Sequence, residues 1–176
     1  MPGVNSKMLL QRISMDFITQ VTSSLIINNT NLLIWASVGV ALLYGFWLVV
    51  NVLRHNAGDG KMQEIATAIQ IGAAAYLQRQ YQVVAMVALI LAALIYFFLG
   101  TNSAIGFLVG ATLSALAGFI GMSVAVRANV RVAEEAKKGL SEAFGLAYKG
   151  GAVTGFVVVG LALAAVFGFY QYTNGD

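Results

Sequence analysis

The sequence contains no cysteine, one proline and one histidine among its 176 residues. The lack of cysteine excludes disulfide bonds and thiolate metal sites, and a single histidine leaves little room for imidazole chemistry. Charged residues are also scarce, at 10% of the chain against roughly 25% in soluble globular domains. Because 59% of the residues are hydrophobic and the mean hydropathy is +0.81, the sequence predicts a membrane protein.

Four long uncharged runs lie along the chain, at residues 32–53, 82–99, 105–126 and 151–170. Each is close to the ~20 residues that carry a helix across a ~30 Å hydrocarbon core. None contains Asp, Glu, Lys, Arg or His, the side chains on which ion pathways and proton relays depend. The sequence therefore predicts an all-α, polytopic fold with four transmembrane helices, and it places any ion pathway outside these spans.

Polar segments extend the second and third runs and keep the helical period. Apolar residues recur every three or four positions in residues 61–81 and 127–147, with charged and polar residues on the other faces. A single helix over residues 61–99 would be roughly 58 Å long, nearly twice the thickness of the hydrocarbon core. We therefore expect two long helical extensions in the cytoplasm.

Two local features accompany these extensions. Gly58 and Asp59 predict the end of one helix and the start of the next. The Gly58–Lys61 string is not a phosphate-binding loop, because the required first glycine and the final Ser or Thr are absent. Glu134 and Lys138 have the spacing of an ion pair across one helical turn of a solvated face.

Residues 1–31 differ in character from the rest of the chain. Their apolar residues alternate with polar ones at three- to four-residue spacing, which is typical of an amphipathic helix at a membrane interface. We therefore expect a leader of residues 1–31, with an interfacial helix, followed by a transmembrane segment of residues 32–176.

The basic residues are distributed unequally between the two sides of the predicted membrane. Eight of the ten lie in residues 54–81 and 127–149, and the other two are in the leader. Their confinement beside apolar runs favours positive-inside anchoring over nucleic-acid binding. We expect these two segments in the cytoplasm, and both termini on the other side of the cell membrane.

Small residues recur along the third and fourth spans and predict close helix packing. Where lipid supplies no hydrophobic drive, such residues let helix backbones approach closely. We expect either helices of this chain or helices from outside it to fill these grooves, and the sequence favours neither. The residues expected at these contacts are Gly106, Gly110, Ser114, Gly118, Gly151, Gly155, Gly160 and Ala164.

Arg127 and Arg131 follow the third span at i,i+4 spacing and therefore share a helix face. They fit ordinary positive-inside anchoring, and they also fit contact with an anion or lipid headgroup, or docking against acidic groups of another helix. The cytoplasmic carboxylates include no D-x-x-x-D pair on one face. We accordingly predict no catalytic, cofactor-binding or metal-binding residue in this chain.

Three strings are more specific than these general features: KMQEIATAIQIGAAAYLQRQY from Lys61, GMSVAVRANVRVAEEA from Gly121, and GGAVTGF from Gly150. In this order and around these spans, they resemble the N-terminal part of membrane-integral, ion-pumping inorganic pyrophosphatases. The similarity covers residues from about 33 to 172.

The resemblance implies a long, all-helical, homodimeric enzyme that hydrolyses Mg²⁺-bound pyrophosphate at the cytoplasmic surface and moves H⁺ or Na⁺ outward. Mg²⁺ is the implied cofactor, with K⁺ as a second candidate ion. The family's catalytic aspartates, phosphate-binding lysines and ion-gate residues match no position here. The resemblance therefore implies an inactive N-terminal scaffold section, contacting lipid and further transmembrane helices of the same subunit. The alternative is a small non-enzymatic structural or accessory membrane subunit that binds partner helices through its glycine faces.

Overall fold

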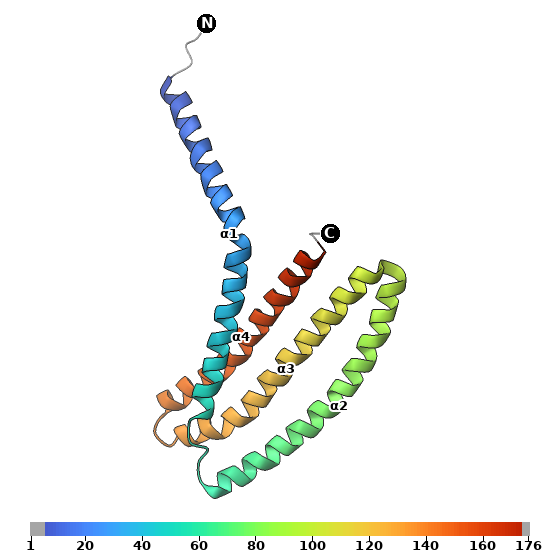
Figure 1. Cartoon of the computed structure of the whole chain (residues 1–176). Coiled ribbons are helices and arrows are strands. Elements are labelled where there is room, and N and C mark those ends of the chain that lie inside the picture. Colours follow the sequence, from blue (N-terminus) through green and yellow to red (C-terminus); the bar gives the residue numbers. More distant parts are fainter. Residues whose placement is uncertain (1–5, 174–176) are drawn as a thin grey trace. The chain divides into compact units, whose positions relative to one another are not determined.

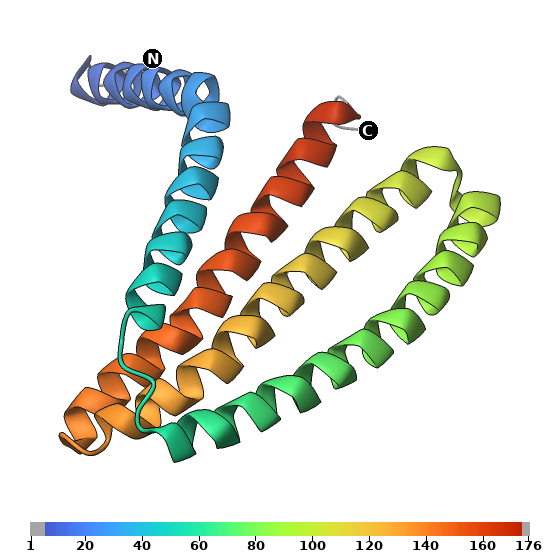
Figure 2. The same cartoon turned by 60° about the horizontal axis from the view of Figure 1, so that its bottom comes forward.

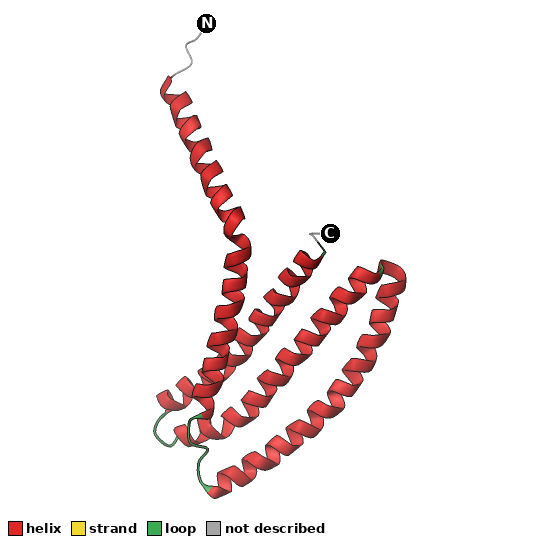
Figure 3. Cartoon of the chain, in the orientation of Figure 1, coloured by secondary structure: helices red, strands yellow, loops and turns green. Residues whose placement is uncertain are grey.

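The computed structural model describes residues 6–173, and all their regular secondary structure is helical (Figures 1 and 3). The four helices are α1 (Ser6–Leu53), α2 (Gly60–Leu99), α3 (Thr101–Glu135) and α4 (Leu140–Tyr172). Residues 29–53 of α1 and each of the other three helices are long and apolar enough to cross a membrane. The prediction of an all-α fold with four spans is confirmed.

The chain divides into two compact units, residues 1–36 and 37–176. In the first unit, helix α1 begins at Ser6, and its Met15 and Ile18 side chains are exposed. The leader of residues 1–31 and its interfacial position stay predictions. Most side chains of the proposed amphipathic face, and both chain termini, lie outside the described residues.

The second unit contains the long helices that the periodicity predicts. Helix α2 has 40 residues and α3 has 35, so they are about 60 Å and about 53 Å long at 1.5 Å per residue. Helix α2 continues without a break through its whole polar extension, so the single helix over residues 61–99 is confirmed. Helix α3 continues only to Glu135, and residues 140–147 begin α4, so the extension of the third run to residue 147 was wrong. The placement of the polar segments in the cytoplasm stays a prediction.

The junction between α1 and α2 departs in part from the prediction. Asp59 is the N-cap of α2 and accepts a hydrogen bond from the Met62 N–H at 3.0 Å, so the predicted helix start is confirmed. The preceding helix ends at Leu53, and placing its end at Gly58 was wrong. Its last turn tightens where the His55 N–H donates to the Val52 carbonyl, and the His55 ring contacts the Asn51 carbonyl at 2.8 Å.

Helix α3 packs against both α2 and α4 and lies between them (Figure 2). Gly100, at φ +88°, forms the reversal between α2 and α3. The last part of α1 joins this layer through Leu48, which is buried with Ala117 of α3 and Val153 of α4. A second buried cluster unites Val52, Ala128 and Leu146. Small side chains in these clusters allow the close helix approach expected in lipid.

Most large apolar side chains of the second unit remain exposed. Examples along α2 are Met86, Leu89 and Phe97, which are 64%, 65% and 80% exposed. In water, so much apolar surface would cause aggregation, whereas in a bilayer it contacts acyl chains or further helices. The packing is therefore that of a membrane-embedded layer of helices.

Candidate functional site

The linkers that follow α1 (residues 54–59) and α3 (residues 136–139) meet at one end of the second unit. We call these two linkers and the helix turns beside them the basic end of the helices. Lys137 joins them: its Nζ lies 3.5 Å from Asp59 Oδ2 and 2.5 Å from Glu134 Oε2. Asp59 belongs to the first linker, and Lys137 follows the end of α3. The predicted polar segments 54–81 and 127–149 therefore share this end of the structure.

The charges at the basic end affect one another. The Met62 backbone N–H, followed by Lys137, lowers the pKa of Asp59, because both stabilise its carboxylate form. A hydrogen bond to Glu134, assisted by the nearby Asp59, raises the pKa of Lys137. Asp59 and Lys137 are both more than half exposed, so solvent screens the pair and limits its strength.

Acidification is expected to weaken the junction at Asp59. Because its pKa is lowered in the folded state, Asp59 contributes stability above its unfolded pKa and loses it as pH falls through the folded value. Between about pH 7 and about pH 3, the melting temperature of Asp59→Asn should fall less than that of the wild type, because Asn has no carboxylate to protonate. Asn keeps an N-cap oxygen, so the helix start itself is retained.

The Lys137→Gln variant is the matched control for this prediction. It removes the ion pair and leaves the larger cause, the Met62 N–H, in place. Most of the Asp59-dependent fall in melting temperature should therefore survive in Lys137→Gln. If Lys137→Gln abolished it completely, the backbone cap would not be the main cause.

The expected Glu134–Lys138 pair was wrong. Lys138 donates to Glu135 Oε1 at 2.8 Å, while Glu134 pairs with Lys137. The reason is that α3 ends at Glu135, and the next turn tightens to i,i+3 bonds from Lys137 and Lys138 to the carbonyls of Glu134 and Glu135. This tightening also explains how the buried carboxylate of Glu135 finds a cationic partner.

Arg127 and Arg131 make different contacts although they share a helix face. Arg131 Nε donates to the His55 carbonyl at 3.1 Å, and its Nη1 donates to the Arg127 carbonyl at 2.6 Å. The cation thus lies at the C-terminal end of α1, where it compensates the partial negative charge of the helix end. Arg127 donates to the Ser123 carbonyl of its own helix at 2.7 Å, and its side chain remains exposed.

The small residues predicted to pack fall into two groups. Three lie against side chains of other helices: Gly106 against Phe169, Gly118 against Tyr81, and Gly160 against Leu42. An added Cβ at Gly110, Gly151 or Gly155 would meet nothing within 4 Å. Ser114 lines hollows on the α2 and α4 sides of α3, and Ala164 is half-buried. Gly110 and Gly151 line hollows between α3 and α4, whereas Gly155 is exposed outside them.

Several contacts between helices were not anticipated from the sequence. Gly121 lies against Thr154, Gly150 lies against Ala128, and the Tyr81 hydroxyl donates to the Ala115 carbonyl at 2.6 Å. The Tyr81 ring also meets Phe119 edge-on, at 6.3 Å between centroids. A tyrosine at the edge of an apolar run is the signal that could have predicted the bond to α3, because a buried hydroxyl requires a partner.

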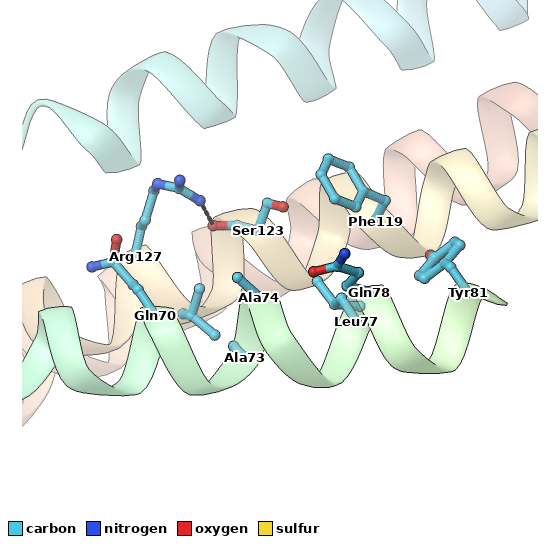
Figure 4. Close-up of a pocket in the computed structure, with 10 residues that line it drawn as sticks. Gln70, Ala73, Ala74, Leu77, Gln78, Tyr81, Phe119, Ser123 and Arg127 are labelled. Atoms are coloured by element: carbon cyan, nitrogen blue, oxygen red, sulfur yellow. Dashed lines mark hydrogen bonds between the residues drawn. The ribbon is translucent and has the colours of Figure 1, made fainter. Parts of the chain in front are cut away.

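A crevice of about 380 Å³ opens between α2 and α3 near the basic end (Figure 4). Arg127 and Gln70 lie at one end, and Phe119 and Tyr81 lie at the other. Among residues 6–173, no group of three or more His, Asp or Glu side chains could hold a metal ion. The arrangement offers hydrogen-bond donors and an apolar floor, and it supplies no ligand set for Mg²⁺.

Comparison with known proteins gives a consistent result. The sequence profile of a family described as inorganic H⁺ pyrophosphatase matches residues 39–175. A K⁺-insensitive pyrophosphate-energized proton pump of Methanosarcina mazei is 46% identical over 140 residues, which is 78% of this chain and 21% of the relative. A proton pump of the same description from Moorella thermoacetica is 43% identical over 77% of the chain and 20% of the relative. The chain therefore spans about a fifth of the length of these curated relatives.

Proposed function

Because this chain belongs to the inorganic H⁺ pyrophosphatase family, we propose that it forms the N-terminal scaffold section of a pump that couples pyrophosphate hydrolysis to H⁺ translocation. The observation that carries the proposal is the family match over residues 39–175, together with relatives named as pyrophosphate-energized proton pumps. Those relatives do not favour the alternative of a self-contained accessory subunit.

Two features support a scaffold role over a catalytic one. The four apolar runs contain no charged side chain that could relay a proton. The exposed glycines Gly151 and Gly155, where an added Cβ would meet nothing within 4 Å, offer smooth surfaces on which further transmembrane helices of the same subunit could pack. The hydrolytic and ion-conducting groups would then belong to those further helices.

The remaining parts of the proposal follow from charge and family. The basic end faces the cytoplasm under the positive-inside rule, so the opposite ends of the helices face outward. The complete pump is a homodimer that takes Mg²⁺-pyrophosphate as substrate. The described residues do not fit a Mg²⁺ site, so the metal would be held elsewhere in the pump.

A chimaera tests this proposal. Residues 37–173 would replace the matching segment of the Methanosarcina mazei relative, and pyrophosphate-driven acidification of inverted membrane vesicles would be measured. We expect the chimaera to pump, because the exchanged segment supplies packing surfaces and leaves the reacting groups untouched.

Two controls define the outcome. The relative with the segment deleted should not pump, and this chain alone should release no phosphate from Mg²⁺-pyrophosphate. A chimaera that accumulates normally in the membrane but does not acidify vesicles would contradict the proposal. So would Mg²⁺-dependent hydrolysis by the isolated chain.

A further inference from the structure

The crevice between α2 and α3 has a charged end and a mainly apolar remainder, in which Gln78 lies beside Leu77 (Figure 4). Arg127 and Gln70 supply guanidinium and amide donors at the charged end, and Phe119 lies toward the opposite end (Figure 4). Arg127 directly follows the uncharged run of α3, whereas Phe119 lies within that run. The two residues are about 12 Å apart along the helix at 1.5 Å per residue. On α2 the crevice residues, from Gln70 to Tyr81, come before the uncharged run of that helix. The crevice therefore lies at the boundary between the charged segments and the uncharged runs, where lipid headgroups are found.

The Arg127 side chain is oriented by one hydrogen bond and remains exposed to an external anion. One guanidinium nitrogen, Nη1, is fixed by its bond to the Ser123 carbonyl, which orients the side chain at the crevice. The side chain is exposed, and no salt bridge joins it to a carboxylate of the described residues. Arg131, one turn away, is already committed to the His55 carbonyl. Arg127 is therefore the arginine of this face that can give its remaining donors to a phosphate.

The floor of the crevice consists mainly of small and apolar side chains, with Gln78 and Ser123 as its polar members. Ala73, Ala74 and Leu77 form it on α2, and Val126 and Phe119 contribute from α3. None of the described residues that line it carries a carboxylate. A soluble phosphate would leave this apolar floor unused, whereas a lipid would cover it with glycerol and acyl carbons.

From this geometry we propose that the crevice binds an anionic phospholipid. The phosphate contacts Arg127 and the Gln70 amide, and the upper part of an acyl chain lies along Ala74 and Leu77 toward Phe119. The helices are membrane-spanning, so such lipids reach the crevice laterally from the bilayer. The proposal does not depend on the pump assignment, because it concerns binding to this chain and not hydrolysis.

Arg79 provides a matched control for Arg127. It has the same charge as Arg127 and lies in the basic segment of residues 54–81 on α2, but it does not line the crevice. At about 100° per residue, Arg79 lies about 180° around α2 from Gln70, on the opposite face. It is exposed, as Arg127 is, so its replacement by glutamine should be tolerated equally well.

The test is native mass spectrometry of the purified full chain in detergent, titrated with phosphatidylglycerol or phosphatidylcholine of identical acyl chains. Both lipids offer a phosphate to Arg127, but the choline cation of phosphatidylcholine opposes the charge of the guanidinium. We therefore expect phosphatidylglycerol, which has no such cation, to bind about tenfold more tightly. Arg127→Gln should abolish this preference, Arg127→Lys should retain part of it, and Arg79→Gln should leave it unchanged. Equal affinity for the two lipids, or equal losses in Arg127→Gln and Arg79→Gln, would overturn the proposal.

A second variant tests the apolar part of the crevice and the alternative occupants. Ala74→Leu fills the floor without changing any charge, and it should weaken phosphatidylglycerol binding while leaving the helical circular dichroism unchanged. Unchanged lipid binding in Ala74→Leu would place the lipid elsewhere and overturn the proposal. Displacement of phosphatidylglycerol by inorganic phosphate or pyrophosphate would also overturn it, because the crevice would then be a site for soluble anions.

Discussion

Replacing Gly121 with alanine is expected to lower the free energy of unfolding by about 2 kcal/mol, the usual cost of overpacking a close contact. An added Cβ would lie 2.8 Å from Oγ1 and 2.9 Å from Cγ2 of Thr154. Thr154 is β-branched and sits on a helix, where its side chain has few alternative rotamers. The helices α3 and α4 would therefore have to separate at this contact. Thermal unfolding in detergent measures the loss.

The chain offers both a matched control and a rescue for this prediction. Gly110→Ala changes the same helix, but its added Cβ meets nothing within 4 Å, so it should be neutral or stabilising by up to about 1 kcal/mol. Thr154→Ala removes both clashing atoms, and the Gly121→Ala, Thr154→Ala double variant should recover most of the loss. Equal effects of Gly121→Ala and Gly110→Ala would show that the contact with Thr154 does not limit packing.

Replacing Gly58 with alanine is the second large effect we expect, with a loss of about 1–2 kcal/mol from the left-handed backbone alone. Gly58 has φ +82°, and an added Cβ would lie 2.6 Å from Met62 Sδ and 2.9 Å from Glu134 Oε2. The clash would push Glu134 away from Lys137 and disturb the residue before the N-cap of α2. The melting temperature at neutral pH should fall accordingly.

Gly60→Ala is the control for the Gly58 variant. Gly60 lies two residues further on, has no positive φ, and leaves open space around an added Cβ. It is the first residue of α2, where alanine is favoured over glycine, so this variant should melt at or above the wild-type temperature. If both variants melted alike, the special backbone of Gly58 would not matter for stability.

The existence of the spanning helices and the length of α2 could be predicted from the sequence, because they depend on local composition. Uncharged runs of about 20 residues fix the spans, and the continued apolar period extends α2 and α3 beyond them. The start of α2 could be predicted for the same reason, because Asp59 caps the helix through the Met62 N–H, only three residues away.

Helix ends and helix rotations could not be predicted in the same way. Helix α1 ends at Leu53, and Arg131, 76 residues later in the sequence than His55, binds the carbonyl just beyond that end. The partner of Lys138 depended on where α3 stops, which the i,i+4 spacing did not indicate. Which glycine meets a neighbour depends on the rotation of α3, and four-residue spacing alone did not separate Gly106 from Gly110.

The bond between Arg131 and the His55 carbonyl sets an order of assembly during synthesis. The end of α1 leaves the ribosome well before Arg131 is made, so this contact must wait for α3. The burial of Leu48 waits longer still, because Val153 belongs to α4. By contrast, α2 and α3 are joined by a single residue and can form a hairpin as soon as both have emerged. Helix α1 is therefore first in the chain but gains its buried neighbours only as α3 and then α4 emerge, and until α4 arrives its Leu48 face is open to lipid or to an insertion chaperone.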